Sequence, residues 1–424
     1  MPHVEGHFHE DTRAPAPQRR PPMTTGTARA PRARRLRRSA PALTPWAQAR
    51  ALARRLPGAT GTERIPLDAA AGRTLATAVV ARTSLPGTDD AAVDGYAVRG
   101  IAPWRVVGRA LAGHGGPPTV AAGEAVEIAA GAAIPAGTHR VVPYEEAQRD
   151  GDLVCTASVT ACRHIRGTGE YVSAGEPVLP AGALLTPAAI GLAAAVGLDT
   201  VTVRRRPVVR LLVTGDEIVA AGTPPPGTVR DAVAPMLAPL LRGWGADVEP
   251  PRYVPDQPAI AGTAAIAAAV HDAEVTVVCG ASSAGPADGL HRSLRLLGAC
   301  VHVDGVACRP AERQVLAQFG DRWLVGVPGD PYAALVAALT LLEPLIGGLT
   351  GRPAAPSAQA LLIGDVRADP RGTRLLPVVR QGACVLGHAA AQARHLGDAA
   401  QADALAVVPV SWRPDRPVEL LSLT

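Results

Sequence analysis

The sequence of 424 residues contains no lysine, so all 42 of its basic residues are arginine. Only 3% of the residues are aromatic, and the six cysteines include no C-x-x-C pair. This cysteine spacing excludes the common structural zinc sites and favours the reduced cytoplasm as the location. The sequence also has no phosphate-binding Gly-Lys loop, no G-x-G-x-x-G motif and no Ser/His/Asp order in a suitable context. It therefore gives no sign of a P-loop, a dinucleotide-binding fold or a serine-hydrolase triad.

The sequence lacks features of a secreted or membrane protein. No apolar stretch follows the arginine pairs near the N-terminus, which argues against a secretory signal. The most apolar span, 332–349, is interrupted by Glu343 and Pro344, so we predict a buried helix and no membrane partner. Residues 1–40 are rich in proline and arginine, and we predict a disordered, solvated tail. An arm that binds nucleic acid is the alternative, but the arginine run has no interleaved aromatic residues, so we expect no nucleic-acid partner.

The first half of the chain is rich in turns. Over the whole chain, Gly and Pro number 44 and 41, about a fifth of the residues, which is below the level of a low-complexity chain. Residues 43–56 have helical spacing, with Thr44 as the expected N-cap. Short apolar pieces between residues 65 and 185 predict short β-strands, and Thr186 is the expected cap of the helix that follows.

From residue 207 the pattern changes to strands that alternate with helices. The run PVVRLLV at 207–213 is typical of a buried parallel strand, and VTVVC at 275–279 and WLVGV at 323–327 continue the series. The other expected elements are helices at 231–243, 258–271, 289–297 and 332–346 and strands at 246–252 and 300–303, and Asp231 is the candidate N-cap of the first of these helices. This order predicts an open α/β sheet, whose ligands bind beyond the carboxyl ends of the strands.

Two loops carry groups of carboxylates. Asp216 and Glu217 follow a buried strand in the motif TGDE, where paired carboxylates can hold Mg²⁺, although a polar turn fits equally well. Asp89, Asp90 and Asp94 lie within six residues in DDAAVDGYA. A solvated acidic turn is the default interpretation of that second group, and a site requires that it docks against the other loops.

Two further loops suit an anion or a rigid corner. The loop GASSAGPAD at 280–288 has small residues and free backbone N–H groups ahead of a helix, which favour an anion, unless Asp288 simply caps that helix. The loop VPGDP at 327–331 has prolines on both sides of Gly329, so a stiff corner is as compatible with it as ligand contact.

Seven blocks in this order resemble the molybdopterin molybdenumtransferase family, called MoeA in bacteria and related to the gephyrin E-domain. The blocks are DDAAVDGYAV, AAGAAIPAGTHRVVPYEEA, IRGTGEYVSAGEPVL, LLVTGDEIV, GTVRDAVAPML, GASSAGPAD and VPGDP, and the resemblance spans about residues 43–410. It implies a Mg²⁺-dependent transferase that inserts molybdate into adenylated molybdopterin and releases AMP. It also implies a homodimer whose cleft lies between the α/β domain of one subunit and the N-terminal half of the other.

The resemblance assigns roles to residues by motif position. It implies catalytic roles for Asp94, Glu217 and Asp288, with Glu217 and Asp288 handling the metal and Asp94 supplied by the partner subunit. It further implies that Gly280, Ser282, Ser283 and Gly285 hold the pterin or its phosphate, that Pro328 and Pro331 shape the molybdate wall, and that Arg309 replaces a lysine of the molybdate loop.

The sequence also departs from the family pattern. Ala130 stands where the family usually has threonine, and the Asp-Ser-Asn block is Asp231-Ala232-Val233. The Lys-Pro-Gly-Lys-Pro molybdate loop is RPAER at 309–313, which keeps two cations but gains an acid. We therefore keep two hypotheses, an active insertase, which we favour, and a catalytically weak paralogue that binds molybdopterin as a scaffold or carrier.

Together these features predict an α/β multidomain protein with a central open α/β domain of molybdopterin-binding type and β-rich N-terminal and C-terminal domains. The predicted divisions are a tail at 1–40, an elongated N-terminal domain from 41–69 and 170–206, an inserted β-rich domain at 70–169, the α/β domain at 207–347 and a C-terminal β-domain at 348–424. The resemblance implies small anionic substrates, and as protein partners a molybdopterin adenylyltransferase and recipient molybdoenzymes.

Overall fold

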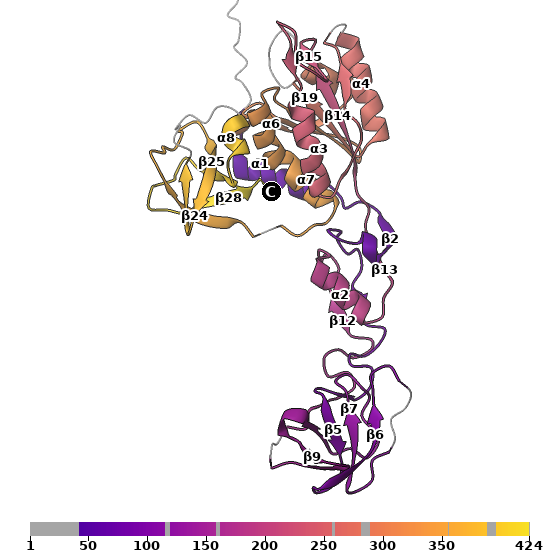
Figure 1. Ribbon diagram of the computed structural model, residues 1–424. Coiled ribbons are helices and arrows are strands. Elements are labelled where there is room, and N and C mark those ends of the chain that lie inside the picture. Colours follow the sequence, from indigo (N-terminus) through magenta and orange to yellow (C-terminus); the bar gives the residue numbers. More distant parts are fainter. Residues whose placement is uncertain are drawn as a thin grey trace, which may run out of the picture. The chain divides into compact units, whose positions relative to one another are not determined.

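The computed structural model describes residues 42–114, 119–157, 162–256, 259–280, 289–354, 356–387 and 396–423. The predicted tail at 1–40 lies outside the described residues. Figure 1 shows the elements in chain order, with few helices and several separate sheets, as expected of an α/β multidomain protein.

The first helix, α1 (Trp46–Arg55), begins later than the sequence predicts. Thr44 does not cap it, because Thr44 and Pro45 form a short strand, β1, that pairs in parallel with β21 (Val306–Arg309). The prediction of a Thr44 cap is therefore wrong. A pairing with a strand more than 250 residues away along the chain decides the start of this helix.

Helix α1 packs against one long helical segment formed by α6 (Pro331–Ala337), a π turn (Ala338–Leu342) and α7 (Glu343–Leu349). By length and composition this is the one helix among the described residues that is able to cross a membrane. However, 89% of its most apolar window is buried inside the protein, in agreement with the predicted core helix.

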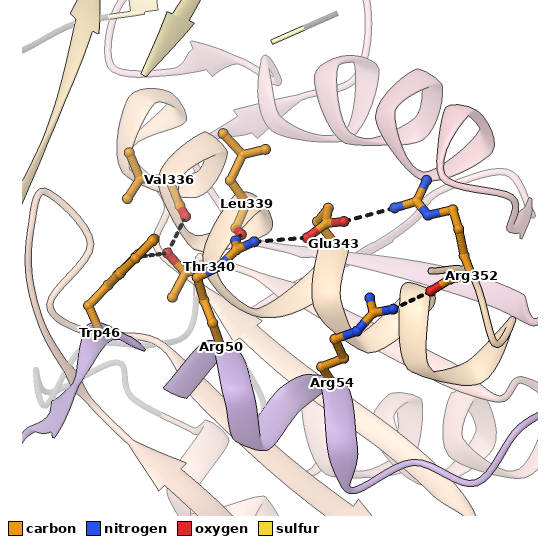
Figure 2. A network of polar contacts seen from close by, with 8 residues as sticks. All are labelled: Trp46, Arg50, Arg54, Val336, Leu339, Thr340, Glu343 and Arg352. Carbon is orange, nitrogen blue, oxygen red and sulfur yellow. Dashed lines mark hydrogen bonds and ion pairs between the residues drawn. The ribbon is translucent and has the colours of Figure 1, made fainter. Parts of the chain in front are cut away.

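Figure 2 shows the hydrogen bonds and ion pair that join polar side chains of α1 to this helical segment. The Trp46 indole N–H donates to the Thr340 hydroxyl at 3.1 Å, and the Arg50 guanidinium donates to the carbonyl of Leu339 inside the π turn. Arg50 also pairs with Glu343 at 3.2 Å. A π turn shifts backbone carbonyls out of the regular helical hydrogen-bond pattern, and the arginine contact gives the Leu339 carbonyl a partner from outside the helix.

The elongated segment before the α/β sheet is made of paired short strands and one helix. Strand β2 (Thr62–Pro66) pairs with β13 (Thr200–Arg204), and β3 (Val79–Val80) pairs with β12 (Pro177–Leu179). Helix α2 (Pro187–Ala195) is capped by the Thr186 side chain, which accepts from the Ala189 N–H at 3.2 Å, so that sequence prediction is confirmed. Apolar side chains from 70–81 share the core of this segment, and the core of the next sheet begins at Ala91.

The inserted β-rich region contains a six-stranded sheet with the order β8-β5-β7-β6-β10-β9. Its strands are β5 (Gly95–Val98), β6 (Trp104–Ala110), β7 (Glu124–Ile128), β8 (Arg140–Pro143), β9 (Gln148–Asp150) and β10 (Leu153–Cys155), and β4 (Asp90–Ala91) pairs separately with β11 (Ile165–Arg166). Strand β5 is buried along its whole length, so the turn that precedes it has a fixed position.

The α/β domain has a sheet with the order β17-β14-β19-β23-β22-β20. Its strands are β14 (Val208–Thr214), β17 (Asp247–Val248), β18 (Arg252–Val254), β19 (Val275–Cys279), β20 (Cys300–Asp304), β22 (Val315–Phe319) and β23 (Arg322–Val327). Its helices are α3 (Val233–Gly243), α4 (Ala259–Asp272) and α5 (Leu290–Leu296), and a separate pair is formed by β15 (Ile218–Val219) and β16 (Val229–Arg230). Alternate side chains of β14 belong to two different cores, one with α3 and one with α4, so these helices cover opposite faces of the sheet (Figure 1).

The parallel strands β14, β19 and β23 lie side by side and confirm the predicted α/β sheet. Strand β22, which the sequence does not predict, adds to β23 in antiparallel register, with Val315 opposite Gly326. The run VLAQF is short and is interrupted by a glutamine, so its alternation is too weak to indicate a strand. This antiparallel addition brings the chain before Val315 to the carboxyl edge of β23.

The C-terminal β-domain is a small closed ring of strands. The strands β24 (Ala358–Ile363), β25 (Thr373–Gln381), β26 (Cys384–Gly387), β27 (Ala404–Val408) and β28 (Val418–Ser422) pair in the order β25-β26-β24-β28-β27, and β27 pairs again with β25. Helix α8 (Leu396–Ala400) precedes β27. Strand β21 of the preceding region pairs with β25, which joins this ring to the chain that leaves the α/β sheet.

Candidate functional site

Three loops meet at the carboxyl edge of the α/β sheet, after β14, β19 and β23. The Gly280 N–H donates to the carbonyl of Val327 at 3.1 Å, and the Thr214 hydroxyl donates to the carbonyl of Cys279 at 2.9 Å. Gly280 has φ +98°, and a Cβ there would lie 2.9 Å from the Thr214 carbonyl oxygen. A Cβ on Gly329 would lie 3.4 Å from the Gly280 Cα. We call this contact of the three loops the strand-end corner, and its packing requires glycine at position 280.

Carboxylates gather beside the strand-end corner. The side chains of Asp216 and Glu217 are exposed in the loop after β14. The backbone N–H of Asp256 donates to the Asp216 carboxylate at 3.1 Å. Burial, and then the charges of Asp216 and Glu217, raise the pKa of Asp256 above its usual value. Asp256 follows the strand RYV at the same edge of the sheet, and no motif in the sequence marks it as a site residue.

Asp231 is a buried carboxylate with a clear structural role. It is 5% exposed, and its Oδ1 accepts from the N–H groups of Val233 at 2.9 Å and Ala234 at 3.2 Å. Asp231 therefore caps the first turn as predicted, but from one position before the N-cap residue, which is Ala232, because the helix starts at Val233. The Tyr253 hydroxyl donates to the other carboxylate oxygen at 2.9 Å. Burial, and then this bond, raise the pKa of Tyr253.

The two prolines predicted for the molybdate wall lie between the end of β23 and the first turn of α6. Strand β23 ends at Val327, immediately before Pro328, and Pro331 is the first helical residue. Asp330 caps the helix, because its carboxylate accepts from the Ala333 N–H at 2.8 Å. The corner formed by VPGDP therefore has a full structural explanation, and its position at the strand ends also makes its backbone available to a ligand.

Asp94 lies on the turn before β5, in the β-rich region. Its exposed carboxylate accepts from the N–H of Ala130 at 2.8 Å, and its carbonyl accepts from the N–H of Tyr144 at 3.3 Å. Its neighbours Asp89 and Asp90 bind Thr168 and Arg166, respectively. Among the described residues, no hydrogen bond or ion pair joins Asp94 to Glu217, so one chain alone does not link these two predicted residues.

The loop RPAER follows β21 and leads into β22. Arg309 pairs with Glu312 at 2.7 Å, so one of the two arginines of the loop already has a carboxylate partner. Ala311 has φ +73°, a left-handed conformation that favours glycine, and glycine is the residue that the family pattern has there. Arg313 is exposed, and no bond to its side chain is found in the part of the chain that the structure describes.

Four predicted site residues belong to the loop that follows Gly280. Ser282, Ser283, Gly285 and Asp288 lie outside the described residues, so their roles stay predictions. The described residues contain no group of three or more His, Cys, Asp or Glu side chains that is arranged to hold a metal ion.

Comparisons with known proteins match both halves of the chain. Residues 44–197 match a family model described as the MoeA N-terminal region, domains I and II, and residues 210–348 match one described as a probable molybdopterin binding domain. The chain is 33% identical to a molybdopterin molybdenumtransferase of Haemophilus influenzae, over 70% of this chain and 75% of that protein. It is 32% identical to molybdopterin molybdenumtransferase 2 of Mycobacterium tuberculosis, over 81% and 90%.

A solved structure supports the fold. The MoeA protein of Pyrococcus horikoshii OT3 is 21% identical and aligns with a TM-score of 0.76 over 89% of this chain and 99% of that one. The sequence matches, the shared fold and the motifs at the strand ends agree with one another. This chain belongs to the molybdopterin molybdenumtransferase family.

Proposed function

We propose that this protein inserts molybdate into adenylated molybdopterin, releasing AMP and leaving molybdenum on the dithiolene. The observation that carries the proposal is the strand-end corner, where Thr214, Gly280 and Gly329 bring three family motifs into contact at the ligand-binding edge of the sheet. The two relatives named above, at 33% and 32% identity, both bear the transferase name, which favours an enzyme over a carrier.

The chemistry requires charge neutralisation and positioning more than a nucleophilic side chain. Both substrates are anions, and the bond to the adenylate is broken by stabilising the charge that develops on its phosphate oxygens. The glycine at position 280 lets the backbones of the three loops come close together at the ligand-binding edge of the sheet. Arg309 and Arg313 supply positive charge for molybdate on a separate loop.

Magnesium fits the residues at the corner in one specific way. Mg²⁺ is usually held by one or two carboxylates together with water and substrate phosphates, so it does not require a complete cage of protein ligands. Glu217 is exposed beside Asp216. Burial, and then the charges of Asp216 and Glu217, raise the pKa of Asp256, and a cation would offset the part that is due to charge. We propose that Glu217 holds Mg²⁺, with Asp288 as a second ligand. When bound, the metal would supply charge stabilisation to the phosphate.

We propose that the active form is a homodimer in which Asp94 of one subunit serves the site of the other. The bonds of Asp94 stay within the β-rich region, and Glu217 stands on the α/β domain. In this arrangement, mixing the inactive variants Asp94→Ala and Glu217→Ala restores part of the activity, because each mixed dimer has one intact site. If the mixture stays inactive although mixed dimers form, the two residues do not share a site across subunits.

The decisive test of the function is AMP release from adenylated molybdopterin with molybdate and Mg²⁺. We expect turnover that depends on both additions. The alternative, a weak paralogue that acts as a molybdopterin carrier, predicts tight binding without AMP release. We further propose that the protein works in the cytoplasm, receives its substrate from a molybdopterin adenylyltransferase and passes its product to molybdoenzymes.

A further inference from the structure

The loop RPAER lies where two separate strands bring arginines together. Arg309, the last residue of β21, is the register partner of Arg374 on β25 of the C-terminal ring. Gly372 lies so close to the backbone of Ala307 that no side chain would fit between the strands. The β21–β25 junction therefore fixes the place of Arg309 relative to the loop that precedes β25.

Two ion pairs stand together at this junction. The Arg309 guanidinium lies 2.7 Å from the Glu312 carboxylate, and the Arg371 guanidinium lies 2.9 Å from the Asp369 carboxylate. The pairs influence each other. Arg371 lowers the pKa of Asp369 to about 2, with a smaller contribution from Arg309. The pKa of Arg371 is raised by Asp369 and, to a smaller extent, by Glu312.

The backbone of the loop holds Glu312 in position. The Val306 N–H donates to the Glu312 carbonyl at 2.8 Å, and the Gly305 N–H donates to the Gln314 carbonyl at 2.9 Å. The fully buried Gln314 side chain donates to the Ala311 carbonyl at 2.8 Å. The Glu312 carboxylate is therefore attached to a braced loop, which keeps it beside Arg309.

We propose that Glu312 is an intramolecular competitor of the oxyanion that Arg309 binds. A carboxylate and a tetrahedral oxyanion use the same N–H donors of a guanidinium, so the Arg309–Glu312 pair must open before an external anion takes its place. Glu312 thereby sets the oxyanion affinity of the loop. This proposal rests on the proposed function, which makes the loop the molybdate site.

The size of the effect follows from the exposure of the pair. The side chains of Arg309 and Glu312 are 41% and 34% exposed, and an ion pair of this kind contributes little to stability. Because the Arg309–Glu312 pair must open before an anion binds, the cost of opening it weakens anion binding by up to about fivefold. Removing the Glu312 carboxylate also makes the net charge of the junction more positive, and this further strengthens anion binding.

The test measures the binding of molybdate alone by equilibrium dialysis at low ionic strength. We expect Glu312→Gln to bind molybdate about fivefold more tightly than the wild type. The matched control is Asp321→Asn, which removes the same charge from a 92% exposed side chain in the turn between β22 and β23, at the opposite edge of the sheet. We expect no change of affinity for the control.

A second variant, Glu312→Ala, shows whether the result depends on the glutamine, and thermal unfolding of each variant verifies the fold. Unchanged affinity in both Glu312 variants overturns the proposal, as does an equal gain in Asp321→Asn. AMP release is measured in parallel and tests the proposed function separately. Tighter molybdate binding in the Glu312 variants supports the proposal that Glu312 competes with the oxyanion, whether or not AMP is released. Intact AMP release with unchanged affinity rejects this proposal alone and leaves the proposed function standing.

Discussion

The strand-end corner and the RPAER loop are both positioned at the carboxyl edge of β23, but different forces fix them. At the corner, backbone atoms of neighbouring parallel strands approach until only glycine fits at position 280. In the RPAER loop, Ala311 adopts a left-handed conformation without being glycine, and partly exposed charges surround it. Packing leaves the corner little freedom, and the loop is held by a few hydrogen bonds and ion pairs.

This difference teaches where variation is tolerated. A backbone that is packed against its neighbours loses both stability and geometry when one atom is added. A partly exposed ion pair contributes little to stability, so its residues are free to change and to alter ligand affinity instead. The family motifs persist at the corner, whereas the departures from the family pattern include the loop.

The largest expected effect comes from adding one methyl group at the corner. Gly280→Ala should destabilise the α/β domain by about 3 kcal/mol, because it combines a left-handed backbone with a Cβ too close to Thr214. AMP release should be lost as well. Thermal unfolding and activity are measured beside the control Gly298→Ala, since Gly298 has φ +72° and no atom within 4 Å of its Cβ. Equal losses in both variants would mean that close approach contributes nothing at position 280.

The next effect separates chemistry from packing at the corner. Glu217→Ala should lower turnover by about a hundredfold, a magnitude typical for the loss of one electrostatic contact to the reacting group. The side chain is exposed, so the unfolding temperature should stay within about a degree of the wild type. Asp321→Ala is the matched control for charge. If Glu217→Ala unfolds instead of losing turnover, Glu217 has a structural role.

A smaller effect concerns the charges of the RPAER junction. Arg371→Gln should raise the pKa of Asp369 from about 2 towards the usual value near 4, because the guanidinium is the main cause of the depression. In the wild type, the stabilisation that accompanies this lowered pKa is present above about pH 4 and is lost as the pH falls towards 2. Carbon NMR titration of the Asp369 carboxyl measures the shift. Arg367→Gln, at an 87% exposed arginine nearby, should leave it unchanged.

The smallest effect tests strain in the RPAER loop. Ala311→Gly should stabilise the protein by about 0.5 kcal/mol, because relief of the left-handed alanine slightly exceeds the entropy cost of glycine. Thermal unfolding measures the change, and molybdate binding should vary little while Glu312 is present. A clear loss of stability would show that the methyl group, which is 6% exposed, contributes more by packing than it costs in strain.

Most of the α/β domain was predictable because its signals are local. The run at 275–279 is a strand with those same bounds, and Thr186 caps its helix through its own side chain. Asp231 caps the next helix as predicted, yet the bond from Tyr253 brings in a residue 22 positions away. Asp256 was missed because nothing in its local sequence distinguishes it, and only the sheet places it beside Asp216.

The sequence by itself determined the family, the alternation of strands and helices and the order of the loops that carry carboxylates and glycines. These depend on residue type and spacing within short windows of the chain. Only the tertiary structure decided that Thr44 joins a strand, that β22 turns back along β23 and that Glu312 occupies Arg309. The first depends on pairing between segments that are far apart in the sequence. The second depends on a tight hairpin whose first strand has too little alternation to be predicted, and the third depends on the backbone bonds that hold one short loop. Periodicity along the chain reports none of them.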